Sequence, residues 1–128
     1  MQLHQSGEDY LETIYILDKK TKYVRSIDIA TELGYSKPSI SRAMKILAKN
    51  NYIEVKDDGQ IVLTEVGLEK AKNIYERHLL ITEFLTNLLH VSEETAESDA
   101  CKIEHVISNE TYLKLKEFID NYKNSNNK

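Results

Sequence analysis

The sequence predicts a mainly α-helical protein, with an N-terminal winged helix-turn-helix followed by a C-terminal helical domain. Three observations lead to this prediction. Apolar residues recur at helical spacing along most of the chain, Gly34 separates two short helical segments, and Asp57-Asp58-Gly59 marks a tight turn between two β-prone runs. A pair of short helices followed by a hairpin is the order of elements in a winged helix-turn-helix.

The first predicted helix covers residues 6–17. Tyr10, Ile14 and Leu17 recur at steps of four and three residues, so they share one helical face. Residues 18–23 are polar and basic, and a loop is predicted there.

The next two predicted helices cover residues 26–33 and about 36–50. The first ends at Gly34, because glycine readily adopts the left-handed conformation that closes a helix. The second begins near Ser36, with Pro38 in its first turn, where the missing N–H costs nothing. A short turn between two helices is the pattern of a helix-turn-helix.

The remaining chain is predicted to form a hairpin and then helices only. The hairpin strands are residues 52–55 and 60–63, and the helices are 65–90, 92–108 and 109–122. These elements give three predicted parts: a winged helix-turn-helix at 1–72, whose first helix also contributes metal ligands, a helical metal-binding and dimerisation domain at 73–123, and a disordered tail at 124–128.

Composition narrows the class of protein. A chain of 128 residues and 14.8 kDa suits one compact domain, or a small module with a helical extension. No apolar run approaches the roughly 20 residues that cross a bilayer, and the N-terminus does not resemble a secretory signal. We therefore expect a cytoplasmic protein with no membrane partner. The single cysteine, Cys101, excludes an internal disulfide.

The charge is unevenly distributed. The net charge of −4 argues against nucleic-acid binding. However, residues 1–64 hold nine basic and nine acidic side chains, whereas residues 65–128 hold eight and twelve. The segment from Gly34 to Ile53 carries four basic residues and no acid. This distribution fits a DNA-reading half joined to a cation-binding half.

The third predicted helix carries the candidate DNA-binding residues, because the second helix of such a pair enters the major groove. Its polar and cationic side chains suit base edges or phosphates, and Arg42 is the best candidate for reading a base. The alternative is an amphipathic helix whose solvated face happens to be basic. The candidates are Ser36, Lys37, Pro38, Ser39, Ser41, Arg42 and Lys45.

The second half carries a candidate metal-binding pattern. Cys101, Glu104 and His105 stand at helical positions i, i+3 and i+4, so a thiolate, a carboxylate and an imidazole share one face. Taken singly, each of these side chains has an ordinary structural explanation, as a small buried residue or a solvated acid. Asp9 and Glu12 form a second i, i+3 pair. With His78, the six side chains suit a first-row transition metal ion, or two ions.

These motifs resemble the diphtheria-toxin-repressor-like family of metalloregulators, and the chain length is similar to its shorter, manganese-sensing (MntR-like) branch. The resemblance spans nearly the whole chain. The matching strings are Glu8-Asp9-Tyr10-Leu11-Glu12-Thr13-Ile14-Tyr15, Lys37-Pro38-Ser39-Ile40-Ser41, Leu63-Thr64-Glu65-Val66-Gly67, Arg77-His78 and Cys101-Lys102-Ile103-Glu104-His105.

The resemblance implies a set of metal ligands and one departure from it. The ligands that match the manganese branch are Asp9, Glu12, His78, Glu104 and His105. At Cys101 the manganese branch often has Glu and the iron branch has Cys, whereas at Asp9 the iron branch has Met. Thr82 stands where the iron branch has a Glu ligand of an ancillary site. The chain is thus a hybrid, and Mn(II) or Fe(II) is expected, with one or two ions per subunit.

The expected function is a metal-dependent transcriptional repressor that binds double-stranded operator DNA as a homodimer. The resemblance implies that metal homeostasis genes are its targets. Three alternatives remain open at this point. A winged-helix regulator of an organic ligand would leave the ligand cluster unexplained, and a thiol sensor at Cys101 would lack a second cysteine. A metal-dependent hydrolase would need a general-base motif, which we do not recognise, so no enzyme activity is expected.

Overall fold

The computed structural model describes residues 5–126, and the chain divides into two compact units, Met1–Asn73 and Ile74–Lys128. The long helix α4 (Glu65–Glu83) begins in the first unit and ends in the second. None of the helices in residues 5–126 is both long enough and apolar enough to cross a membrane.

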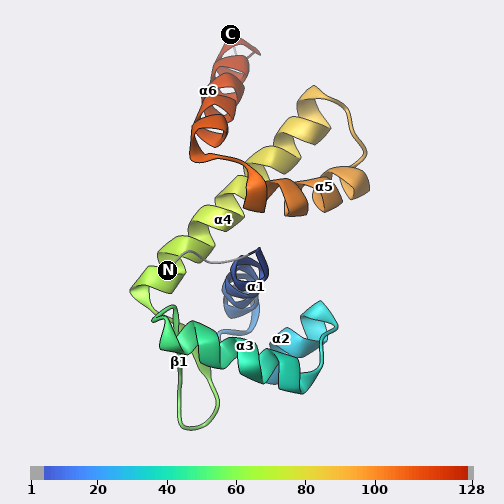
Figure 1. Ribbon diagram of the computed structural model, residues 1–128. Helices are drawn as coiled ribbons and strands as arrows, with labels where there is room; N and C mark the ends of the chain where they lie inside the picture. The colour runs from blue at the N-terminus through green and yellow to red at the C-terminus, as the bar shows by residue number, and fades with distance from the viewer. Residues whose placement is uncertain (1–4, 127–128) are drawn as a thin grey trace. The chain divides into compact units, whose positions relative to one another are not determined.

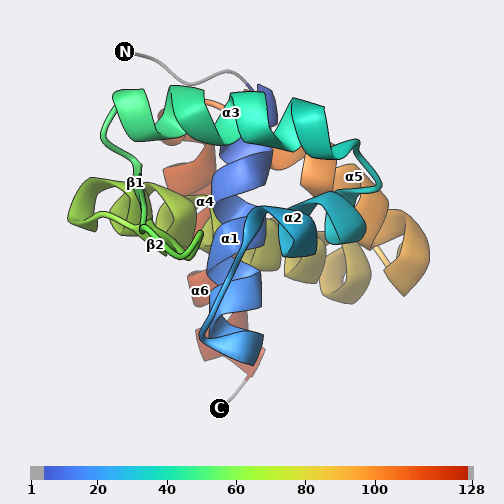
Figure 2. The same ribbon diagram turned by 90° about the horizontal axis from the view of Figure 1, so that it is seen from below.

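The first unit is a winged helix-turn-helix. Its helix α2 packs against α1 and α3, and the hairpin packs against α3 and α1 (Figures 1 and 2). The predicted fold is therefore confirmed. Its elements before α4 are α1 (Gln5–Thr21), α2 (Ser26–Leu33), α3 (Lys37–Lys49), β1 (Ile53–Val55) and β2 (Ile61–Leu63).

The turn between α2 and α3 has the local chemistry that the sequence predicts. Gly34 takes a left-handed conformation, with a φ of 72°, and its N–H donates to the carbonyl oxygen of Ala30. Ser36 caps α3, since its Oγ accepts from the backbone N–H of Ser39 at 3.3 Å. Pro38 lies in the first turn of α3. These caps fix the direction in which α3 leaves the turn.

One apolar core joins the helices of the first unit to the hairpin. On α3, the residues Ile40, Met44 and Leu47 are buried, which leaves the polar residues of that helix on its other faces. The core consists of Leu11, Ile14, Leu17, Val24, Ile29, Ala30, Ile40, Met44, Leu47, Ile53, Ile61 and Ala71.

The hairpin is antiparallel, and Ile53 pairs with Leu63 while Val55 pairs with Ile61. The N–H of Ile61 also donates to the carbonyl oxygen of Val24 at 2.7 Å, so the segment before α2 lies alongside β2. The hairpin is thereby attached to the helix-turn-helix on its β2 side.

The second unit contains the end of α4, a π-helical turn η1 (Phe84–Leu88), α5 (Glu93–Val106) and α6 (Asn109–Asn126). Two threonines bond to the backbone of α4 itself: Thr82 Oγ1 donates to the carbonyl of His78 at 2.7 Å, and Thr86 Oγ1 donates to that of Thr82 at 2.9 Å. Such bonds loosen the regular α-helical pattern. The buried apolar residues of the second unit are Ile74, Ile81, Ala96, Ala100 and Ile119.

Three element boundaries differ from the prediction by more than two residues. Helix α1 continues to Thr21, so the loop predicted at residues 18–23 is wrong for residues 18–21, whose polar side chains tolerate an exposed last turn. The helix predicted at 65–90 changes to a π-helical turn at Phe84. Helix α6 runs to Asn126, so residues 124–126 are helical where a disordered tail was expected, and residues 127–128 lie outside the described part.

Candidate metal centre and nucleic-acid interface

His78 lies on α4 in the second unit and contacts two carboxylates of α5. Its Nδ1 is 2.8 Å from Glu104 Oε2, and its Nε2 is 2.9 Å from Glu97 Oε1. A neutral imidazole donates through only one nitrogen, so both contacts are hydrogen bonds only when the ring is protonated. The hydrogen bond to Glu104 raises the pKa of His78 from 6.5 to about 9, against the opposing effect of burial, and the charges of Glu104 and Glu97 add to the rise.

Glu104 is the centre of this cluster. It is 1% exposed, and its second oxygen, Oε1, lies 3.2 Å from Nε2 of the neighbouring His105. One buried carboxylate therefore lies between two imidazoles. A buried charge is costly unless it is paired, so the cluster is an electrostatic site and not part of the apolar core. Carboxylate oxygen and imidazole nitrogen are also the donors that bind first-row divalent metals.

Arg77 positions the part of α4 that carries His78. Its guanidinium donates to the carbonyl oxygen of Ile107 at 3.0 Å and to Asn109 Oδ1 at 3.3 Å, and it lies 5.1 Å from the ring centre of Tyr112. These contacts attach α4 to the junction between α5 and α6. Arg77, which is not itself a candidate ligand, thereby fixes the position of His78 relative to α5.

The first unit contains the two carboxylates that the sequence analysis singled out as a second i, i+3 pair of candidate ligands. Asp9 and Glu12 are one turn apart on α1, and each offers a carboxylate oxygen within 4.8 Å of the other. Glu12 is only 7% exposed. Two negative charges at this separation repel one another, and a cation that both carboxylates bind reduces that repulsion.

Cys101 and Thr82 are not among the close ligand atoms of the described residues. In the described part of the chain, the close group of ligand atoms that contains Glu104 and His105 does not contain the thiol of Cys101, which is exposed. The hydroxyl of Thr82 bonds to the backbone, so it does not replace the carboxylate that the iron branch has there.

Glu97 is the residue that sequence reasoning missed. It lies on α5, and its side chain is 66% exposed, so by exposure it resembles any solvated acid. Its spacing carried a usable signal, because Glu97, Cys101 and Glu104 stand at positions i, i+4 and i+7 of one helix. Residues at these steps share a face, and Glu97 extends the face that the metal-binding pattern already defines.

The predicted DNA-binding residues are gathered on α3. Lys37, Ser41, Arg42 and Lys45 are exposed, and Ser39 is half-buried. Arg42 Nη2 donates to Ser39 Oγ at 3.4 Å. The chain thus presents a polar and basic helix at the surface of a winged helix-turn-helix, which is the geometry of a major-groove reader.

Two successive parts of the chain also match the two domains of one family of regulators. Residues 2–61 match the iron dependent repressor N-terminal DNA binding domain, and residues 64–127 match the iron dependent repressor metal binding and dimerisation domain. The chain belongs to the iron-dependent repressor family. The members of this family are metal-dependent transcriptional regulators, so the predicted family and class of function are confirmed.

Individual relatives of this chain support the same assignment. It is 35% identical to an uncharacterized HTH-type transcriptional regulator of Methanocaldococcus jannaschii, over 94% of this chain and 98% of the relative. It is 37% identical to the HTH-type transcriptional regulator MntR of Geobacillus kaustophilus, over 80% of this chain and 72% of that protein.

A solved structure agrees in fold. The structure of the manganese regulator SloR has a TM-score of 0.79 at 28% identity, and the match covers 94% of this chain and 55% of that chain. The chain thus spans about half the length of that solved regulator.

Proposed function

We propose that this chain is a cytoplasmic transcriptional repressor that binds operator DNA as a homodimer when Mn(II) or Fe(II) is bound, with one or two ions per subunit. The observation that carries the proposal is the buried carboxylate of Glu104 between the imidazoles of His78 and His105. A site of this composition suits a first-row divalent ion. The name of the manganese regulator SloR supports the choice of manganese.

The proposed metal ligands are those that the sequence predicts. His78, Glu104 and His105 have the support of their mutual contacts, and Asp9 and Glu12 have the support of their close carboxylate oxygens. The proposal that Cys101 is a ligand is supported by its helical spacing alone. The full set is Asp9, Glu12, His78, Cys101, Glu104 and His105.

The proposed mechanism follows from where these ligands stand in the sequence. Asp9 and Glu12 belong to the DNA-binding half, and the other ligands belong to the metal-binding and dimerisation half. Ligation by both sets restrains the two halves, whereas without a cation the carboxylates repel one another. In a dimer, this restraint favours recognition helices that are spaced like successive major grooves, about 34 Å apart. Linkage requires that operator DNA tighten metal binding in return.

The proposed DNA contacts lie on α3 and its N-terminal cap. They are Ser36, Lys37, Pro38, Ser39, Ser41, Arg42 and Lys45. Their support is that α3 is the second helix of the helix-turn-helix and that its exposed side is basic.

The test is a titration of the repressor with buffered Mn(II), Fe(II), Zn(II) or chelator, read by fluorescence anisotropy of a labelled duplex. The duplex is selected from a randomised library with the manganese-loaded protein. We expect a metal to be required for tight binding, and His78→Ala to raise the metal concentration needed by about 10- to 100-fold. His90→Asn is the matched control, because His90 is an exposed histidine with a φ of 59° that Asn tolerates. Equal binding with metal and with chelator would rule the proposal out.

A further inference from the structure

Three carboxylates lie within little more than one turn near the start of α1, and two of them are proposed ligands. Asp9 and Glu12 offer oxygens to one group of close ligand atoms, which in the described part of the chain does not include the carboxylate of Glu8. Glu8 and Glu12 are four residues apart, so their side chains lie on one side of the helix. The placement of Glu8 therefore affects which carboxylates face an ion.

Glu8 forms an ion pair with Lys70 of α4, within the first unit. Lys70 Nζ lies 3.3 Å from Glu8 Oε2, and the side chain of Glu8 is only 15% exposed. Salt screens such a partly buried pair less than it screens a pair at the open surface. Of the three carboxylates, the one that is not a proposed ligand is thus held by a cation.

The backbone that carries Lys70 is held firmly in place. Ala71, the next residue, is fully buried in the apolar core of the first unit. Almost one turn earlier, Gly67 passes the carbonyl oxygen of Tyr52 so closely that an added Cβ would stand 1.9 Å from it. Lys70 therefore extends from a fixed part of α4, and its ammonium restrains the position of Glu8.

The same turn of α1 has a second contact, through Tyr10. The ring of Tyr10 meets the ring of Tyr35 edge to face, with centroids 6.3 Å apart and an angle of 81° between the planes. Tyr35 lies in the turn between α2 and α3, and its backbone N–H donates to the carbonyl oxygen of Ala30 at 3.1 Å. Glu8 and Tyr10 are two residues apart, about 200° around the helix, so the two contacts hold nearly opposite sides of this turn.

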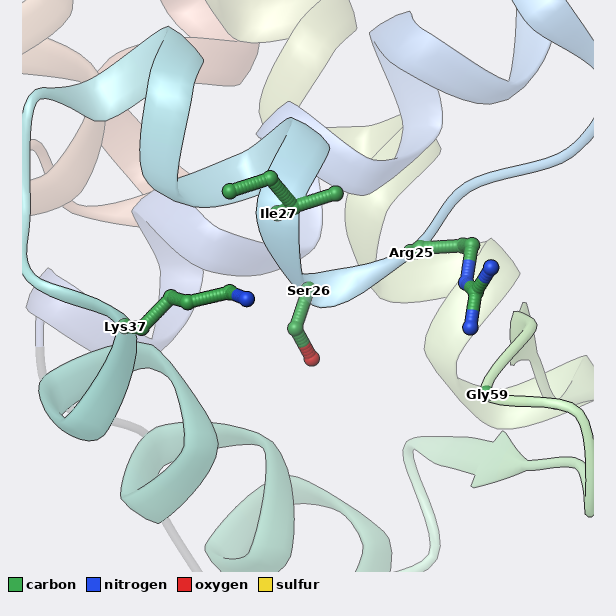
Figure 3. A pocket seen from close by; sticks show the side chains of 5 residues that line it. All are labelled: Arg25, Ser26, Ile27, Lys37 and Gly59. Atoms are coloured by element: carbon green, nitrogen blue, oxygen red, sulfur yellow. The ribbon is translucent and has the colours of Figure 1, made fainter.

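Two other cations of the first unit have different partners. The side chains of Arg25 and Lys37 line a hollow near the hairpin turn (Figure 3). Arg25 Nη2 also donates to the carbonyl oxygen of Asp58 at 2.8 Å. These two cations therefore belong to the hairpin and the helix-turn-helix, whereas Lys70 contacts the helix that carries the carboxylate ligands.

We propose that Lys70 and Tyr35 are positioning residues of the metal site, which hold the start of α1 so that its two ligands face the ion. The proposal rests on the proposed metal binding and goes beyond it, because neither residue is a ligand. Asp9 and Glu12 repel one another when no cation lies between them, and that repulsion displaces side chains that are not held in place. Contacts that orient a ligand typically change metal affinity by about 10- to 100-fold. Because Lys70 and Tyr35 act through residues next to the ligands, we expect the lower end of that range.

The test measures Mn(II) affinity without DNA, from the electron paramagnetic resonance signal of the unbound ion, in Lys70→Met, Glu8→Gln and the double variant. If the pair acted by charge alone, loss of the cation would strengthen Mn(II) binding and loss of the anion would weaken it. Positioning predicts a loss of about tenfold in each single variant. The double variant should lose the same factor and not the product of the two, because both changes break one contact.

Tyr35 is tested in the same way. Tyr35→Leu removes the ring contact with Tyr10 and should weaken Mn(II) binding by about tenfold, whereas Tyr35→Phe keeps the ring and should bind as the wild type does. Lys70→Arg keeps the charge and should likewise retain the affinity. Lys72→Met is the matched control, since Lys72 is an exposed lysine of α4 that lies about 200° around the helix from Lys70. Its Mn(II) affinity should equal that of the wild type.

A second readout does not involve the metal. Amide hydrogen exchange at the start of α1 should be faster in metal-free Lys70→Met and Tyr35→Leu than in the wild type and Lys72→Met. Unchanged exchange or stronger Mn(II) binding by Lys70→Met would overturn the proposal. Lower urea midpoints at unaltered Mn(II) affinity would also overturn it, in favour of a merely structural role. These measurements need no operator, so their failure is distinct from equal duplex binding with metal and with chelator, which would refute the proposed function.

Discussion

At the scale of single residues, the protonation of His78 decides how metal binding depends on pH. Its two ring nitrogens both contact carboxylates, so the metal-free cluster favours the imidazolium, with a pKa of about 9. A metal ion binds only a nitrogen that has lost its proton. At the proposed site, the ion and the proton therefore compete for the same ring.

We predict that metal uptake at pH 7.5 releases about one more proton in the wild type than in His78→Gln. The raised pKa means that His78 is still protonated at this pH, so apparent metal affinity should rise about tenfold per pH unit from this group below pH 9 and level off above it. Calorimetry in buffers with different ionisation enthalpies counts the protons. Equal proton release in the two proteins would show that His78 is not deprotonated by metal binding.

The choice of metal is also decided by single ligands. Asp9, Glu12 and Glu104 supply hard oxygen donors that suit Mn(II) and Fe(II), whereas Cys101 is the soft donor of the proposed set. The exposure of Cys101 leaves its contribution open to a direct test by substitution.

We predict that wild type is activated by Mn(II), with Fe(II) close behind, and that Zn(II) binds tightly. Cys101→Glu should shift the preference toward Mn(II) by about tenfold, and Asp9→Met should shift it toward Fe(II), because each change alters the balance of hard and soft donors. Anaerobic binding to the selected duplex against each buffered metal measures the preference. An unaltered ranking in both variants would remove Cys101 and Asp9 from the ligand set.

At the scale of elements, predictions made from local chemistry are confirmed. Gly34 and Ser36 determine the ends of α2 and α3 through bonds to residues within four positions, and these bonds follow from residue type alone. The π-helical turn at Phe84–Leu88 contains no Gly or Pro to announce it. The side chains of Thr82 and Thr86 bond to backbone carbonyls at this turn, but threonine also occurs in regular helices, so its presence did not predict a π-helical turn.

The part of the site that the sequence did not reveal depends on contacts between elements. The spacing of Cys101, Glu104 and His105 on one helix is a local property, and from it we predicted that their side chains share one face; Glu104 and His105 indeed lie 3.2 Å apart. The contact between His78 and Glu97 joins α4 to α5 across nineteen positions and depends on how the chain folds back after η1. Periodicity assigns Glu97 to one face of its helix, but it does not predict which other helix packs against that face.

The junction between the hairpin and α4 supplies a prediction at this scale. Gly67 is buried in the first turn of α4, where an added Cβ would stand 1.9 Å from the carbonyl oxygen of Tyr52. We predict that Gly67→Ala lowers the free energy of unfolding by about 3 kcal/mol, because the backbone must move to relieve the overlap. Gly34→Ala is the comparison: it meets open space but has a φ of 72°, and should cost about 1 kcal/mol. Urea unfolding measures both, and equal losses would contradict the steric argument.

At the scale of the whole molecule, the sequence shows two functional halves because each carries its own charge pattern. The segment from Gly34 to Ile53 is basic, and the excess of acid lies after residue 64. The division into units after Asn73 lies within α4, where no composition change marks it. Charge thus predicted the functions of the halves, and the observed division lies one residue from the boundary predicted between residues 72 and 73, although it falls inside a continuous helix.

Assembly is the last property that the chain's surface predicts. The second unit leaves large apolar side chains exposed on its helices and just after the π-helical turn, among them Leu79, Leu89, Val106 and Phe118, and Val106 is 76% exposed. This is more apolar surface than an isolated unit of its size readily tolerates in water, and its domain model is one of dimerisation.

We predict a two-fold symmetric homodimer at micromolar concentration, which recognises a pseudo-palindromic site. Leu89→Glu should shift the sedimentation coefficient toward that of a monomer, because a charge placed in an apolar interface loses its hydration. Ile46→Glu is the matched control: Ile46 is equally exposed, at 54% against 55%, but belongs to the first unit. Sedimentation velocity with and without Mn(II) measures the state of each protein. A wild type that sediments as a monomer in both conditions would contradict dimerisation, whereas an unchanged Leu89→Glu dimer would place the interface on another apolar face.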